Sequence, residues 1–122
     1  MATTKQAMSL TSSLKVVRDT DADATGEADL NVGAATLYLV SIDNSANASQ
    51  KVYFKLWDAT APTVGTTAPN MIIPAPGGAT VTLAILEGLS FATGISAACV
   101  TAGGTGGITG PTSDVITVLV FA

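Results

Sequence analysis

The chain has 122 residues, which suits one domain with one modest core. Charged residues make up 11% of it, against roughly 25% in an ordinary soluble domain, and the formal net charge is −4. The few cations form no cluster, which argues against nucleic-acid binding, and no apolar run approaches a membrane span of about 20 residues. Histidine is absent and there is one cysteine, so the usual general base and an intrachain disulfide are both excluded.

The N-terminal region lacks the apolar periodicity found in the rest of the chain. Residues 1–13 are small and mostly polar, with Met8 and Leu10 as isolated apolar side chains and no signal-peptide core. We therefore predict an extended N-terminal arm over residues 1–13, ordered on a partner, and a single domain over residues 14–122. Residues 14–18, LKVVR, predict the first short strand of that domain.

Residues 19–29, DTDADATGEAD, predict an acidic loop that holds five of the nine carboxylates. Asp19, Asp21 and Asp23 alternate as ligands do in a calcium loop, but Leu30 stands where an EF-hand needs its bidentate glutamate. An EF-hand is therefore excluded. A looser calcium site on these three aspartates is a weak candidate, and a solvated loop is the favoured interpretation.

Residues 36–44, TLYLVSIDN, are apolar on both faces and predict a central strand that is covered on both sides. The connection to residues 51–58, KVYFKLWD, is short, so we predict that the two strands form an antiparallel hairpin.

The KVYFKLWD strand alternates between a core face and an amphipathic face; these consist of Val52, Phe54 and Leu56, and of Tyr53, Lys55 and Trp57, respectively. On the amphipathic face, the aliphatic stem of Lys55 is expected to lie along the rings while its ammonium group reaches water. This face is interpreted either as local packing or as an interface, since Trp and Tyr are enriched in interface hot spots.

The second half of the chain is divided into short strands by Pro and Gly. Prolines in residues 59–76 leave only residues 70–73 for a short edge strand, and Gly-rich residues 101–111 predict a loop. Further strands are predicted at 79–86, 89–91, 95–100 and 114–121, with Glu87-Gly88 as a turn. Seven or eight short strands without a helical period predict an all-β, two-sheet antiparallel sandwich, with a jelly roll as the favoured version because the last strand then takes a central position.

The sequence offers no recognisable catalytic constellation. The carboxylates near strand ends have the turn-forming or capping roles that are common there; they are Asp43, Asp58, Glu87 and Asp114. Cys99 lies in an apolar strand and is interpreted as a buried structural thiol. The glycines of residues 103–110 lack the GK[ST] ending of a phosphate loop. We therefore predict no enzyme activity, no catalytic residues and no cofactor.

Several short motifs occur within residues 36–122: a K-L-x-D strand end, a P-x-x-G-x-x-x-P loop, a P-G-G turn, a G-L-x-F-x-T-G-I segment and a closing valine-rich strand. Their residues are Lys55, Leu56, Asp58, Pro62, Gly65, Pro69, Pro76, Gly77, Gly88, Phe91, Thr93 and Gly94. Together they resemble small all-β virion proteins of tailed bacteriophages, among them capsid decoration (cement) proteins with a sandwich or jelly-roll body.

This resemblance implies a structural protein that binds the outer surface of the phage head and stabilises the shell. Its partners would be the major capsid protein and further copies of itself, as a dimer or trimer at a symmetry axis, with no nucleic acid or membrane involved. The expected interface residues are Tyr53, Lys55, Trp57, Met8 and Leu10. A charge-poor surface costs little to desolvate and agrees with permanent assembly.

Three alternatives are left open. The first is a receptor-binding β module of a tail fibre or baseplate, with carbohydrate as one ligand class. The second is a secreted adhesive β domain. The third is a Thr-rich β domain that has no partner.

Overall fold

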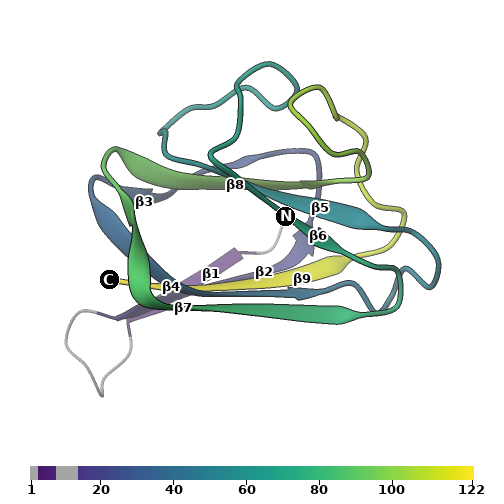
Figure 1. Cartoon of the computed structure of the whole chain (residues 1–122), viewed down its shortest axis with the longest axis horizontal. Coiled ribbons are helices and arrows are strands. Elements are labelled where there is room, and N and C mark those ends of the chain that lie inside the picture. The colour runs from purple at the N-terminus through teal and green to yellow at the C-terminus, as the bar shows by residue number, and fades with distance from the viewer. Residues whose placement is uncertain (1–2, 8–13) are drawn as a thin grey trace.

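The fold is an antiparallel β-sandwich. The computed structural model describes residues 3–7 and 14–122, and this part of the chain forms nine strands and no helix. The strands are β1 (Thr3–Ala7), β2 (Lys15–Ala22), β3 (Glu27–Val32), β4 (Ala35–Asp43), β5 (Val52–Trp57), β6 (Met71–Ala75), β7 (Thr80–Phe91), β8 (Gly94–Val100) and β9 (Val115–Phe121). Two sheets pack face to face around the core (Figure 1). The predicted all-β, two-sheet fold is confirmed.

The strand order is that of a jelly roll. One sheet has the order β1-β2-β9-β4-β7 and the other has the order β3-β8-β5-β6. Apart from β1, the strands pair from the chain ends inward: β2 with β9, β3 with β8, β4 with β7, and β5 with β6. Such nesting results when one long antiparallel hairpin wraps around a two-sheet sandwich. The closing strand, β9, lies between β2 and β4, so its predicted central position is also correct.

Strand alternation determines which side chains fill the core. Val52, Phe54 and Leu56 of β5 are buried in one cluster with Leu119 and Phe121 of β9, as the core face of KVYFKLWD predicts. In β8, by contrast, all seven residues are buried. This strand has the core on one face and connecting loops on the other, and its small side chains allow both layers to approach closely.

The predicted hairpin between β4 and β5 is wrong, because the two strands belong to different sheets. The buried side chain of Asn44 holds the crossing between them. Its Nδ2 donates to three carbonyl oxygens and its Oδ1 accepts one hydrogen bond; the partners are Gln50 O (2.8 Å), Ala75 O (3.3 Å), Pro76 O (3.1 Å) and Asn47 Nδ2 (2.9 Å). A short connection can therefore cross between the sheets when a side chain replaces the missing backbone partners.

The N-terminal boundaries also differ from those predicted. β2 extends to Ala22 and β3 begins at Glu27, so the acidic loop shrinks to residues 23–26. Residues 3–7 of the predicted arm form β1, which pairs antiparallel with β2. Met8 and Leu10 lie outside the described residues. The alternation of small and acidic residues in 19–22 is thus a strand pattern, in which Asp19 and Ala22 are the buried positions.

The predicted turn at Glu87-Gly88 is a β-bulge within one long strand. Ala84 pairs with Leu39 and Leu89 pairs with Leu37, so residues 85–88 of β7 stand opposite a single residue of β4. Gly88 has a φ of 81°, and a Cβ atom at this position would collide with Thr36 Cγ2. Glycine is therefore required at the bulge, and the prediction of a turn at Glu87-Gly88 is wrong.

Candidate interaction surface

The longest strand of the described chain, β7, forms an edge of its sheet and pairs only with β4. Native proteins usually blunt such edges with Lys, Pro or other charged residues. Of the other edge strands, β1 contains Lys5, β3 contains Glu27 and Asp29, and β6 contains Pro74. The 12 residues of β7 include Glu87 as their single charge and no proline. Within the described part of the chain, β7 is therefore the longest edge strand and carries one charge and no proline, and its bulge at residues 85–88 is what interrupts the edge.

A shallow, largely open apolar groove lies along this edge, between β7 and Met71 of β6. It is lined by Met71 of β6 and residues 83–89 of β7, which are here called the β7 flank. Leu83 and Ile85 reach the core from this side and are only partly buried. Leu86, in the bulge, is 94% exposed. The sandwich thus leaves part of its apolar interior open at this flank.

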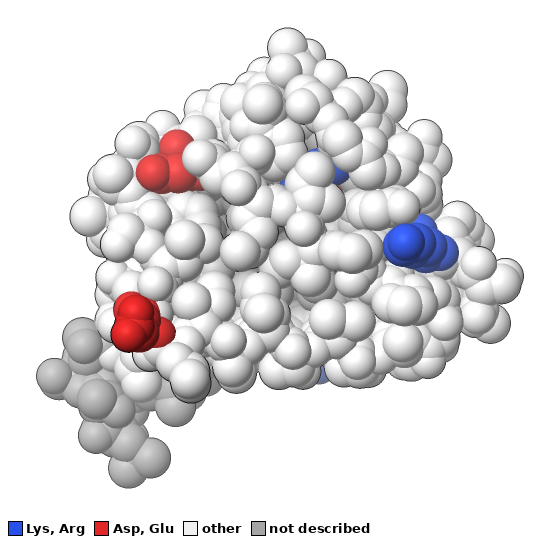
Figure 2. All heavy atoms as spheres, viewed as in Figure 1, with Lys and Arg blue, Asp and Glu red and all other residues white. Residues whose placement is uncertain are grey.

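Charged side chains are sparse on the surface. In Figure 2, acidic and basic atoms form small, separate groups on a largely uncharged face. Glu87 is the only ionisable residue lining the groove. Large contiguous apolar patches mark sites that a partner covers, and the β7 flank is a small patch of this kind. Sequence reasoning did not identify this flank, although residues 79–86 are a charge-free alternating run and provide a signal for it.

The amphipathic face of β5, by contrast, is not an available surface. Trp57 and Lys55 are both 0% exposed, and Tyr53 is partly buried. The indole Nε1 of Trp57 donates to the Thr67 carbonyl at 2.9 Å, and the Tyr53 ring packs next to Gly103. Two loops, residues 58–70 and 101–114, thus cover this face. The predicted interface role is wrong for Lys55 and Trp57, whose position is described by local packing, the alternative interpretation, whereas the role of the partly buried Tyr53 stays a prediction.

Lys55 lies directly beneath the Gly-rich loop. Its Nζ has the Gly107 carbonyl as its acceptor, at 3.4 Å, and no carboxylate forms an ion pair with it among the described residues. Burial lowers the pKa of the Lys55 amine below its ordinary value. A Cβ atom at position 107 would lie 2.5 Å from the Ala102 carbonyl oxygen. The Gly-rich loop therefore serves close packing, and the expectation that the Lys55 ammonium reaches water is wrong.

Asp58, at the end of β5, holds the turn between β7 and β8. Its carboxylate accepts hydrogen bonds from the backbone N–H groups of Ala92 (3.0 Å), Thr93 (2.7 Å) and Gly94 (3.3 Å). These hydrogen bonds, that from Ala92 most strongly, lower the pKa of the Asp58 carboxyl. Asp58 therefore has the capping role that its position at a strand end predicts, and its lone pairs are committed to the fold.

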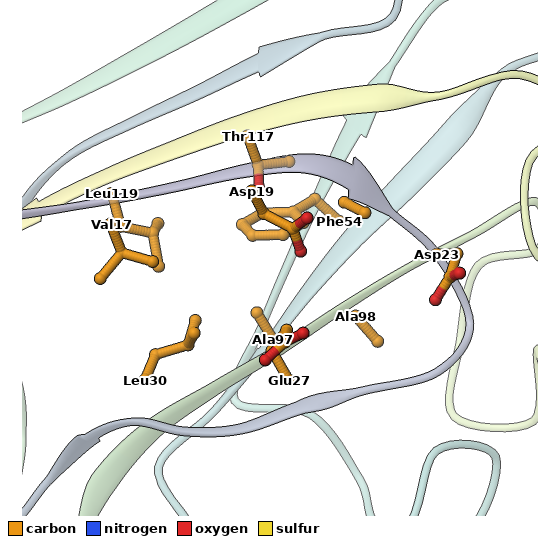
Figure 3. A pocket seen from close by; sticks show the side chains of 11 residues that line it. Val17, Asp19, Asp23, Glu27, Leu30, Phe54, Ala97, Ala98, Thr117 and Leu119 are labelled. Atoms are coloured by element: carbon orange, nitrogen blue, oxygen red, sulfur yellow. The ribbon is translucent and has the colours of Figure 1, made fainter. Parts of the chain in front are cut away.

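A small cavity of about 10 Å³ lies between the sheets near the β2–β3 turn. Asp19 of β2 and Glu27 of β3 point into this space, and Asp23 lies to one side at the turn (Figure 3). Asp19 is 6% exposed, and burial is the main reason why its pKa rises to about 6. The cavity has room for about one water molecule.

The three aspartates of the calcium candidate do not converge on a common point. Asp19 Oδ1 accepts from the Asp21 backbone N–H at 3.1 Å, and Asp23 Oδ1 accepts from Thr25 N–H at 2.8 Å. Among the described residues, no group of three or more Cys, Asp or Glu side chains is placed to hold a metal ion. Cys99 is fully buried, and burial raises the pKa of its thiol to about 12.

Comparison with known proteins gives a fold-level likeness. No family model and no curated protein matches the chain. An RmlC-like cupin protein from Desulfovibrio desulfuricans is 14% identical with a TM-score of 0.36, and the match covers 98% of this chain and 81% of that one. HppE with iron(II) is 16% identical with a TM-score of 0.30, covering 87% of this chain and 42% of HppE. HppE with cobalt(II) and Tris buffer is 16% identical with a TM-score of 0.32, and the match covers 97% of this chain and 52% of HppE.

These neighbours correct one prediction. The sequence-based exclusion of enzyme activity is contradicted by these neighbours, which include HppE with iron(II) and with cobalt(II). At this level of identity a likeness describes the fold alone, so no activity is transferred to this chain.

The part of the chain that the structure describes contains no helix that is long and apolar enough to cross a membrane.

Proposed function

We propose that the protein is a capsid decoration protein of a tailed bacteriophage, which binds the outer surface of the head and stabilises the shell. The observation that carries the proposal is the β7 flank, a shallow apolar groove beside a long edge strand with a single charge, on a charge-poor protein. Such a surface favours aggregation on a protein that stays alone, but it stabilises a permanent assembly. In this proposal the major capsid protein and further copies of the chain are the partners.

The motifs that resemble those of phage virion proteins lie in the body of the fold, which supports the proposal. Asp58, Thr93 and Gly94 belong to those motifs, and they meet in the turn held by the Asp58 carboxylate. Gly65, another motif residue, approaches Ile108 so closely that a Cβ atom there would collide with the Ile108 side chain. The motif residues thus build the loop layer over β5. The contact surfaces are proposed to lie elsewhere, with the β7 flank foremost.

Binding to heads that lack the protein tests the proposal. Heads from phage in which the gene is disrupted would be mixed with purified protein and sedimented, with isolated tails from the same phage as the control. We expect saturable binding to heads in hundreds of copies, together with a higher temperature of DNA release. Binding to tails alone would favour the receptor-binding alternative, and binding to neither particle would refute both.

The predicted contacts of the N-terminal region with the head need a separate test by substitution. Met8 and Leu10 remain predicted contacts, and residues 3–7 belong to β1, so deletion of the whole arm would also remove a strand. A double Met8→Ser, Leu10→Ser variant changes the two predicted contacts and keeps β1. Reduced binding to heads with an unchanged circular dichroism spectrum is expected, and unreduced binding would remove these residues from the interface.

A further inference from the structure

We infer that the outer face of the five-stranded sheet binds the same face of a second copy, about a two-fold axis that runs along β9. This outer face, called the sheet face below, consists of the side chains of that sheet that point away from the other sheet. The inference deepens the proposed function, on which it rests for the role of the dimer, by naming the surface through which copies of the chain associate. The dimer itself can be tested on the free protein.

The β9 strand is apolar on both of its faces. Its inward residues are buried, and the alternate residues Ile116, Val118 and Val120 are partly exposed on the sheet face. An antiparallel sheet with one face in water usually carries polar residues on that face. No described segment lies over the sheet face in Figure 1. The sequence also predicts cover on both sides of β4, and the described chain supplies it on one side only.

The apolar side chains of the sheet face continue across the neighbouring strands. Val120 is paired with Val16 of β2 on one side and with Leu39 of β4 on the other. Leu39 is in turn paired with Ala84 of β7. These four residues form an unbroken apolar row across four strands, with Val118 beside it. Large contiguous apolar patches mark sites that a partner covers.

The size of the sheet face is sufficient for a specific contact between two copies. Five strands make it about 24 Å wide, and the seven residues of β9 make it about 24 Å long. Two such faces, counted as flat, bury about 1,100 Å² in total, which is above the roughly 1,000 Å² of a specific interface. Two sheets can pack in this way with their strands aligned to within about 30°.

The charges of the sheet face favour a second copy and select the axis. Among its described, paired residues, Arg18 of β2 is the only cation and Asp43 of β4 is the only anion, and β9 lies between these strands. A two-fold axis along β9 places β2 of each copy over β4 of the other, so opposite charges lie about 7 Å apart along the strands. An axis across the strands would instead oppose the two arginines. A strongly charged partner finds no matching charge here.

Sedimentation velocity of the full-length protein over a range of concentrations tests for the dimer. Val118→Glu places a carboxylate at the centre of the sheet face, and Arg18→Glu reverses the charge at an exposed position. Val32→Glu is the matched control, because Val32 is 72% exposed on β3 in the other sheet. Circular dichroism and Trp57 fluorescence establish that each variant is folded.

Cross-linking with a short bismaleimide tests the axis. Val118 and Thr82 lie in the same row of paired residues, on β9 and on β7. Val118→Cys lies on the axis and faces its own copy, whereas Thr82→Cys lies two strands away from β9, so its two copies are about 19 Å apart. The wild type gives the background, because Cys99 is fully buried.

We expect a dimer for the wild type and for Val32→Glu, and cross-linked dimers for Val118→Cys but not for Thr82→Cys. Val118→Glu should raise the dimer dissociation constant by about 100-fold or more, because each dimer would bury two unpaired carboxylates, and Arg18→Glu should raise it by about 10-fold. A monomeric wild type, equal cross-linking of the two cysteine variants, or a Val118→Glu variant that dimerises as tightly as the control would overturn the inference. Monomers that still bind heads would refute this inference alone, and dimers that bind no head would refute the proposed function alone.

Discussion

Replacing Asp19 by Asn tests whether a buried carboxylate weakens this fold at neutral pH. Asp19 lies on the inward side of β2 with 6% of its surface exposed, and the cavity beside it has room for about one water molecule. Burial raises its pKa from 3.8 to about 6, and the nearby charges of Asp21 and Glu27 act in the same direction. Asparagine has nearly the same shape, and its Oδ1 can still accept the Asp21 backbone N–H that Asp19 accepts now.

The sign of the effect follows from the direction of that pKa shift. Below pH 3.8 the carboxyl is protonated in both the folded and the unfolded states, so burial of its charge costs nothing. Between pH 3.8 and about 6 the folded state holds more protons than the unfolded state, so the free energy of unfolding falls as the pH rises. Above pH 6 the full cost is present, at most about 3 kcal/mol for a shift of this size. Asp19→Asn should therefore be more stable than the wild type by up to that amount at pH 7.5 and equally stable at pH 3.5.

Urea unfolding followed by Trp57 fluorescence measures this difference, since Trp57 is the only tryptophan and is fully buried. Protein concentration is held constant, because any self-association would make the unfolding midpoint depend on it. Asp114→Asn is the control, an exposed aspartate whose replacement should change stability by less than about 0.5 kcal/mol. If Asp19→Asn is no more stable than the wild type at pH 7.5, or if its advantage is the same at pH 3.5, the assignment of a destabilising buried carboxylate is wrong.

Three further variants test the packing of the loops, each by urea unfolding unless stated. Lys55→Met removes an amine that burial has placed beneath the Gly-rich loop and should stabilise the protein by about 1 kcal/mol at neutral pH; a large loss of stability would show that the amine is well compensated. Asn44→Ala leaves three carbonyl oxygens without their donor and should cost about 2–4 kcal/mol, whereas Ser45→Ala, at an exposed neighbouring position, should cost little. Asp58→Ala should destabilise the protein and speed amide hydrogen exchange at Thr93 and Gly94, and unchanged exchange there would exclude the capping role.

Strand alternation and the positions of prolines correctly predicted those features of the fold that can be inferred from the sequence of a single strand. The core face of β5 and the central position of β9 could be inferred because a period of two places alternate side chains on one face. The short strand between Pro69 and Pro74 is β6, at the edge of its sheet, as the prolines indicate.

The features that sequence reasoning missed depend on contacts between distant segments. Whether β4 and β5 share a sheet is decided by the Asn44 hydrogen bonds, which reach residues as far away as Pro76. The burial of Lys55 depends on a loop about 50 residues later in the chain, which alternation within β5 cannot report. A Glu-Gly pair is found both in turns and in bulges. Only the pairing of β7 with β4 on both sides of Gly88 shows that this one is a bulge.

The candidate surface lies at a different place from the predicted interface residues. A charge-poor composition indicates a protein that is covered by partners, yet the aromatic side chains drew the prediction to β5, where loops from the same chain already cover them. The aliphatic edge of β7 is the exposed alternative. Aromatic content is thus a poor guide to an interface when the aromatic residue can pack inside its own domain.

The copy number of the protein in purified virions tests the central claim most directly. Quantitative mass spectrometry would compare peptides of this chain with peptides of the major capsid protein in the same particles. The proposed function predicts hundreds of copies per particle, in a fixed simple ratio to the major capsid protein. A handful of copies that separate with the tail, or none at all, would contradict it.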